Sequence, residues 1–354
     1  MKDFITSFKA IADYNIWKNS RRYVEPNATY IKDDKIVITT KFEPSTKYLT
    51  IESLEDSNTI SFKTNDNGIA KTIRISTDNG SIWTDKTSST SGVTLATLNT
   101  GDKLLVKGSN IAYGNYSNYF NYFVSTGEFN VSGNIMSMIY GDNFIGQTPL
   151  DSIGYNFRGL FYNCTKLKNA EYLVLPATTL ANNCYAYMFK NCTSLITAPE
   201  LPATTLATRC YVGMFDGCTS LTTAPELPAT TLANYCYQQM FLGCTSLIVA
   251  PELPATTLAN YCYRNMFVDC TSLTIAPELL ATTLVKYCYQ EMFKGCTSLN
   301  YVKCFATNIS ATNCTDDWLK NVAATGTFVK DANMTDWPTG TSSIPSGWTI
   351  QDAA

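Results

Sequence analysis

LPATTLANNCYAYMFKNCTSLITAPE, residues 175–200, decides the architecture of this 354-residue chain, because it returns almost unchanged every 26 residues. Further copies follow at residues 201–226, 227–252 and 253–278, with a degraded copy from Leu279 onward. Repeats of fixed length stack as the coils of a solenoid, in which each coil buries its apolar edge against its neighbours. A half-unit at residues 159–170, GLFYNCTKLKNA, places the start of the array earlier. We therefore expect a solenoid over residues 131–314.

The middle of each copy predicts a helix. At 100° per residue, Ala181–Cys192 gathers its apolar side chains, from Cys184 and Tyr185 to Met188 and Phe189, on one arc about 140° wide. These positions are constant from copy to copy, which indicates the core, whereas the opposite side varies, which indicates exposure to solvent. A short strand near Leu195–Ala198 follows. One helix and one strand per coil predict an α/β solenoid.

Residues 43–130 predict a small all-β, sandwich-like domain. Turn signals such as Asn65-Asp66-Asn67-Gly68 and Asp78-Asn79-Gly80 separate β-branched runs, and Asn-Gly between such runs favours a hairpin. The runs are Tyr48–Ile51, Thr59–Lys63, Lys71–Ser76, Ser81–Thr84, Leu95–Leu98 and Lys103–Lys107.

The two ends of the chain predict an attachment arm and a cap. Residues 1–42 form the arm, in which Asp3–Trp17 is an amphipathic helix that docks on the next domain or on another subunit and Lys35–Lys41 is a strand. Its candidate docking residues are Phe4, Phe8, Ile11 and Trp17. Residues 315–354 form the cap, since an open solenoid end exposes its core.

Composition narrows the functional classes. The formal net charge is −3 and no basic cluster occurs, so we expect no nucleic-acid partner. No apolar run approaches the roughly 20 residues that span a bilayer, so we expect no membrane span. Histidine is absent, which removes the usual general base and metal ligand. We expect no cofactor, no bound metal and no catalytic residue, and we expect the thirteen cysteines to be buried free thiols.

The repeat resembles a known family. Met188-Phe189, then Cys192-Thr193-Ser194-Leu195, a short strand and Leu201-Pro202 resemble the BspA-type leucine-rich repeat. Here the Pro-Ala-Thr-Thr-Leu-Ala connection is longer than in the commoner form. The resemblance implies a leucine-rich repeat fold and surface adhesion, because family members are bacterial surface proteins or proteins of phage particles. It carries over no catalytic residue.

These observations predict a non-enzymatic binding module on a phage virion that contacts the host surface. The first residues do not read as a signal peptide, since Thr6, Ser7 and Lys9 interrupt the apolar run, which favours assembly in the host cytoplasm. The alternatives are a bacterial cell-surface adhesin and a purely structural head or tail protein. Expected partners are other virion or surface proteins at the N-terminal region and a host protein or glycan. Whether the chain forms a homo-oligomer is left open.

The candidate binding surface is the varying side of the predicted helices, because only there do charge and size change between copies. It comprises Tyr187, Lys190, Arg209, Asp216, Gln238, Gln239, Arg264, Asn265, Gln290, Glu291 and Lys294. A second candidate is the aromatic patch of Tyr113, Tyr116, Tyr119 and Tyr122, which either meets a partner or fills the seam between the sheet and the array. A carboxylate column formed by Glu200 and its equivalents is an alternative, enzymatic site, but it offers no unique pair.

Overall fold

The computed structural model describes residues 29–32, 35–38, 44–115, 119–335, 337–340 and 343–353. The chain divides into two units, residues 1–43 and 44–354. In the first, β1 (Thr29–Lys32) pairs antiparallel with β2 (Lys35–Ile38). The candidate docking residues Phe4, Phe8, Ile11 and Trp17 lie outside the described residues.

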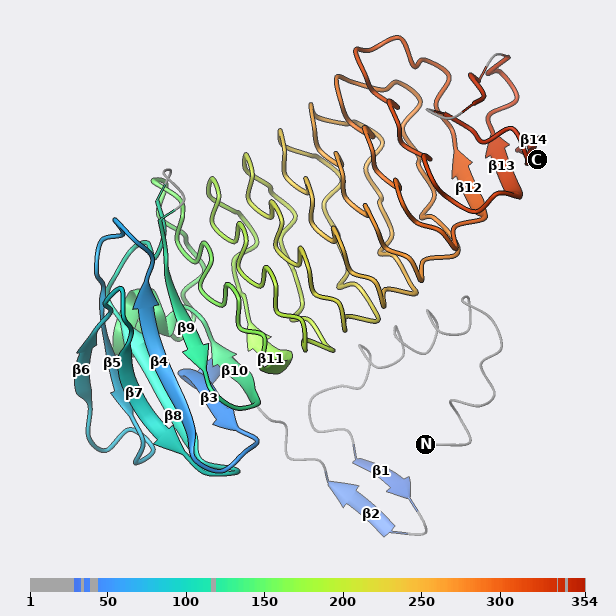
Figure 1. The fold of residues 1–354 in the computed structure, drawn as a ribbon. Helices are drawn as coiled ribbons and strands as arrows, with labels where there is room; N and C mark the ends of the chain where they lie inside the picture. The colour runs from blue at the N-terminus through green and yellow to red at the C-terminus, as the bar shows by residue number, and fades with distance from the viewer. Residues whose placement is uncertain are drawn as a thin grey trace. The chain divides into compact units, whose positions relative to one another are not determined.

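The second unit opens with two β-sheets that share one hydrophobic core (Figure 1). The larger has the strand order β11-β10-β3-β8-β5-β6, and the smaller β7-β4-β9. In those orders the strands are Leu167–Val174, Phe129–Asn134, Leu49–Ser53, Lys103–Gly108, Thr72–Ser76 and Thr84–Thr87, then Val93–Leu98, Asn58–Thr64 and Asn121–Ser125. Alternating buried side chains such as Ile60 and Phe62 face this core. Three short helical turns complete the region, namely η1 (Pro44–Thr46), α3 (Ser137–Tyr140) and η2 (Gly141–Asn143).

Only one of the two expected hairpins forms. β5 and β6 pair antiparallel around Asp78-Asn79-Gly80, where Asn79 and Gly80 have positive φ as the turn requires. The hairpin expected around Asn65-Asp66-Asn67-Gly68 is wrong, because β4 pairs with β7 and β9 whereas β5 lies in the other sheet. The two strands bury their apolar residues on opposite sides of the core, and that packing outweighs the local turn signal.

The repeats stack as successive coils (Figure 1), but the predicted α/β solenoid of leucine-rich repeats is wrong. Residues 181–192 contain no helix, and they fold as consecutive tight turns. Along the described part of the chain, the α-helix is confined to Ser137–Tyr140. Apart from the 3-10 turns η1 and η2, the remaining regular structure there is β, in parallel and antiparallel sheets.

The backbone amides of a coil form two kinds of hydrogen bond, one to the next coil and one within the coil. The amides of Tyr185, Tyr187 and Phe189 donate to carbonyl oxygens of the next coil, at 2.8 to 3.0 Å. The amides of Met188 and Lys190 donate to the carbonyl three residues earlier and so close each turn. Both sets of buried polar groups are therefore satisfied without a helix.

The error has a geometric cause. Cys184, Met188 and Cys192 recur at intervals of four residues, and a helix of 3.6 residues per turn drifts by only about 40° over four residues. Three turns of a helix and three four-residue turns thus place the same side chains inside. The backbone differs, because the turns need a positive φ at every fourth residue, which helices lack.

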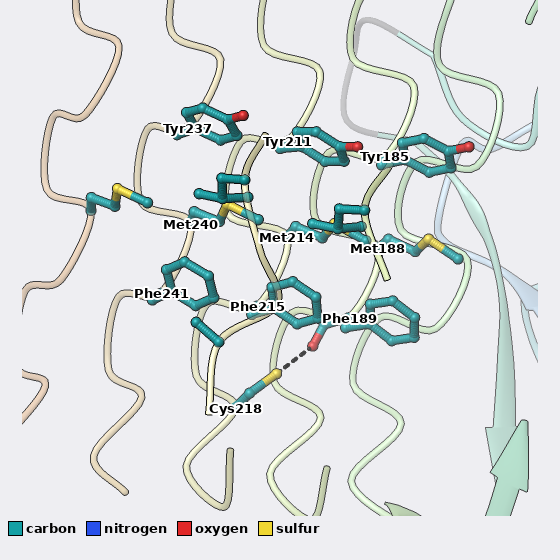
Figure 2. Packing of buried hydrophobic residues seen from close by; sticks show 14 of the residues in the cluster. Tyr185, Met188, Phe189, Tyr211, Met214, Phe215, Cys218, Tyr237, Met240 and Phe241 are labelled. Carbon is teal, nitrogen blue, oxygen red and sulfur yellow. Dashed lines mark hydrogen bonds between the residues drawn. The ribbon is translucent and has the colours of Figure 1, made fainter. Parts of the chain in front are cut away.

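The core consists of side-chain columns that run from coil to coil (Figure 2). In one column the rings of Phe189, Phe215 and Phe241 stack with centroids 5.5 and 5.7 Å apart. The Cys218 thiol donates to the Phe189 carbonyl oxygen at 3.1 Å, and equivalent cysteines repeat the bond. All thirteen cysteines are buried and free, as predicted.

Each end of the stack is closed. At the first coil, Phe123 of β9 stacks on Phe161 at 5.4 Å, which joins the β-sheet core to the coils. At the far end, β12 (Tyr301–Cys304), β13 (Gly326–Lys330) and β14 (Trp348–Asp352) form a parallel sheet. Trp318, fully buried, stacks on Tyr289 of the preceding coil at 6.4 Å. This cap keeps the last core column from water.

Candidate functional site

The tight turns form one side of the stack, here called the turn face: residues 181–192 of one coil and the equivalent residues of its neighbours. Each coil has three positions with positive φ on this face, four residues apart. Stacking aligns them in three columns. The first holds Tyr155, Asn183, Arg209, Tyr235, Tyr261, Tyr287 and Asn313; the second holds Gly159, Tyr187, Gly213, Gln239, Asn265, Glu291 and Asp317; the third holds Asn163, Asn191, Gly217, Gly243, Asp269, Gly295 and Asn321.

The residues of the third column suit the positive φ that the backbone adopts there. Every member is Gly, Asn or Asp, the residues that adopt left-handed backbone at least cost. The first two columns depart from this pattern, since Tyr, Arg, Gln and Glu occupy the same conformation at φ between 52° and 61°. Such residues cost about 1–2 kcal/mol each there.

Three of these residues form a half-buried ladder. Tyr235, Tyr261 and Tyr287 stack with ring centroids 4.4 and 4.7 Å apart. The Arg209 guanidinium lies 4.5 Å from the centroid of Tyr235, and the Lys286 ammonium lies 5.3 Å from that of Tyr287. Arg209 and Lys286 are exposed and the rings are half-buried. We call these five residues the tyrosine strip.

The second column and its neighbours carry charges that pair with one another. The Lys190 ammonium lies 2.5 Å from the Asp216 carboxylate of the next coil. The Glu291 carboxylate accepts hydrogen bonds from Lys294 at 2.8 Å and from the Asn265 amide at 2.6 Å. The bond from Lys294 is the main cause that lowers the pKa of Glu291. These carboxylates are therefore neutralised within the turn face.

The predicted surface residues all lie on the turn face, although no helix carries them. Arg209 is exposed, whereas Asp216 and Asn265 are buried. The others are half-buried, namely Tyr187, Lys190, Gln238, Gln239, Arg264, Gln290, Glu291 and Lys294.

The sequence reasoning missed Tyr235, Tyr261, Tyr287 and Lys286. A helical projection places the position of Asn183 on the outer side, yet Arg209 was the only member of that column included in the candidate surface. A four-residue period would have found it, because residues that favour positive φ occur at that interval within one coil, as Gly213 and Gly217 do.

The candidate aromatic patch is not one surface. Tyr113 is fully buried, and its hydroxyl donates to the Met138 carbonyl oxygen at 2.7 Å. Tyr119 and Tyr122 are half-buried, and Tyr122 packs edge-on against Tyr162 of the first coil at 6.2 Å. Tyr116 lies outside the described residues. Tyr113, which stacks on Phe157 at 6.5 Å, and Tyr122 thus lie at the seam between the β-sheets and the coils, which was the structural alternative.

Neither a metal cluster nor a bilayer-spanning helix occurs in the described ranges. There, no group of three or more cysteine, aspartate or glutamate side chains converges on one point. No helix there combines the length and the apolar character that crossing a membrane requires. Of the carboxylate column, Glu200, Glu252 and Glu278 are exposed, and Glu278 pairs with Lys303 at 2.9 Å.

No family model, curated protein or solved structure matches this chain. The resemblance to BspA-type repeats therefore rests on the residues alone.

Proposed function

We propose that this protein is a non-enzymatic binding module, an appendage of a phage particle that attaches to the host surface through its turn face. The observation that carries the proposal is the contrast between the columns. The third column uses only Gly, Asn and Asp, so the fold accepts them, yet the first column holds Arg209 and four tyrosines in the same strained conformation. Strained residues persist where their side chains are needed, and such positions cluster at binding sites.

Stacking alone does not account for these tyrosines. An aromatic pair contributes about 0.5–1.5 kcal/mol, which is close to the cost of about 1–2 kcal/mol for each left-handed tyrosine. The ladder therefore adds little net stability. What it does provide is a rigid, half-exposed surface of rings and hydroxyls, and such residues are enriched at recognition surfaces.

The cysteines favour the virion setting. Thirteen buried thiols without a disulfide suit a chain that folds in a reducing compartment. Phage particles are assembled in such a compartment, the host cytoplasm. Mass spectrometry of purified particles from the culture that carries the gene tests this setting, and we expect the protein in the particle. Its recovery only from bacterial envelope fractions would instead favour a cellular adhesin.

The role of the turn face is tested by attachment of the labelled protein to cells of that culture. We expect the triple variant Tyr235→Asn, Tyr261→Asn and Tyr287→Asn to stay folded, because Asn tolerates positive φ, and to lose at least about tenfold in attachment, equivalent to about 1.4 kcal/mol. The matched control places asparagines outside the turn face on three successive coils, at Thr222, Ile248 and Thr274, which are exposed. Equal losses in both variants would exclude the turn face as the binding surface. Particles that fail to assemble when residues 159–314 are deleted would indicate a structural role.

A further inference from the structure

The tyrosine strip has a composition that restricts what it binds. In the first column and at the residue before each of its members, from Asn182 to Asn313, Arg209 and Lys286 are the charged residues and no carboxylate occurs. They lie at the two ends of the tyrosine ladder. The nearby carboxylates of Asp216 and Glu291 are already bonded to Lys190 and Lys294. The strip is thus a cationic stretch, and beside it Lys190 pairs with Asp216 and Lys294 with Glu291.

The ring faces of the ladder are covered. Tyr261 is stacked on both sides, by Tyr235 and Tyr287. The Arg209 guanidinium covers the far side of Tyr235, and the Lys286 ammonium lies over Tyr287. A sugar ring that stacks on an aromatic residue needs a free ring face; Tyr261 has none, and each outer ring already has a cation over it. Ring edges, hydroxyl donors and three cations remain, the third being Arg264, whose guanidinium lies 5.9 Å from the centroid of Tyr261.

These groups match an extended peptide better than a glycan. Tyrosine hydroxyls donate to carboxylates or to backbone carbonyl oxygens, and tyrosine edges contact apolar side-chain atoms. Arg209 and Lys286 pair with carboxylates. Asn234 and Asn260, exposed beside the ladder, add amide donors and acceptors that suit a peptide backbone.

We propose that the tyrosine strip binds an acidic peptide segment of a protein on the target surface. The inference rests on the proposed attachment function and names its partner class. The cationic side chains favour a negatively charged partner, and the covered ring faces favour a peptide over a sugar.

Fluorescence anisotropy with three labelled probes tests the inference: a 12-residue peptide of alternating Glu and Ser, its Gln counterpart, and polygalacturonate as the acidic glycan. We expect the intact protein to prefer the Glu peptide, with an affinity that falls as salt rises. The double variant Arg209→Gln and Lys286→Gln should weaken this binding about tenfold, since exposed ion pairs contribute up to about 1 kcal/mol each. Tyr261→Phe, which keeps the stack and removes one hydroxyl, should weaken it about threefold.

The matched control is Lys86→Gln with Lys103→Gln, which removes the same net charge from the β-sheet region and should change the affinity less than twofold. Binding to polygalacturonate but not to the Glu peptide overturns the inference, as does an equal loss in both double variants. If the intact protein does not bind the Glu peptide but the triple tyrosine variant still loses cell attachment, the proposed function stands and the partner class is wrong. If the intact protein binds no cells, the proposed function itself fails.

Discussion

Two buried tyrosines differ in what their hydroxyl groups contact. The Tyr237 hydroxyl finds no hydrogen-bond partner in the described structure, although the residue is almost fully buried. The Tyr113 hydroxyl donates to the Met138 carbonyl oxygen at 2.7 Å. A buried polar group without a partner costs about 1–3 kcal/mol, whereas a satisfied one contributes about 1 kcal/mol.

The two tyrosines should therefore respond oppositely to loss of the hydroxyl. We expect Tyr237→Phe to raise the free energy of unfolding by about 1 kcal/mol and Tyr113→Phe to lower it by about 1–2 kcal/mol. Urea unfolding followed by circular dichroism measures both. A loss of stability in Tyr237→Phe would mean that its hydroxyl has a partner, such as a bound water.

At the scale of the elements, the cysteine columns make stability sensitive to alkaline pH. Burial raises the pKa of Cys210, Cys262, Cys296 and Cys304 to about 12, whereas a thiol in an unfolded chain titrates near 8.5. Because the folded pKa is the higher one, the stabilisation is fully present below about pH 8.5 and is lost as the pH rises toward 12.

Between about pH 8.5 and about pH 12, each such thiol should lower the free energy of unfolding by about 1.4 kcal/mol per pH unit. We expect a steep loss of stability above about pH 9. The double variant Cys210→Ala and Cys262→Ala should reduce that slope by about 3 kcal/mol per pH unit, whatever its stability at neutral pH. The free energy of unfolding, measured at several pH values, gives the slope. An unchanged slope would mean that these thiols ionise in the folded protein.

The elements also show what the sequence could predict. β3, β4, β5, β7 and β8 fall where β-branched runs end at turn residues, because alternation and Asn-Gly or Gly-Asp turns are local properties. β6 was placed too early, since Ser81 and Ile82 belong to the turn before Thr84. The turns of the coils could not be distinguished from a helix by apolar spacing, because four-residue turns and helices bury the same side chains over three turns. The interval of four residues from Gly213 to Gly217 was the missed signal, since two glycines this close in the sequence disfavour a helix.

At the scale of the whole molecule, each coil bonds mainly to its two neighbours, so the number of coils should be adjustable. Deleting residues 227–252 joins Glu226 to Leu253, the same junction that Glu252 makes in the intact chain. The core columns then remain in register, and we expect a folded protein with a cooperative transition at a lower temperature. Circular dichroism and thermal unfolding measure this outcome.

The matched control deletes residues 227–250, two residues fewer. That deletion shifts the later core positions by two residues relative to the coils before them, so Asn265 would lie opposite Phe215 and Phe267 would lie opposite Gly217 of the third column. We expect this variant to aggregate or to unfold without cooperativity. Equal behaviour of the two deletions would contradict the register described by the stacked columns.

The layered bonding between coils also sets how the protein responds to mechanical force. When the solenoid is pulled from its two ends, the force loads the backbone hydrogen bonds between neighbouring coils, such as those from Tyr185 to Cys210 and from Tyr211 to Cys236. Nearly identical coils have nearly identical interfaces, so they yield one after another at similar loads. Each one that opens releases 26 residues, which lengthens the chain by about 90 Å. Under a sudden pull the chain therefore lengthens in steps, and the coils that have not yet opened stay folded.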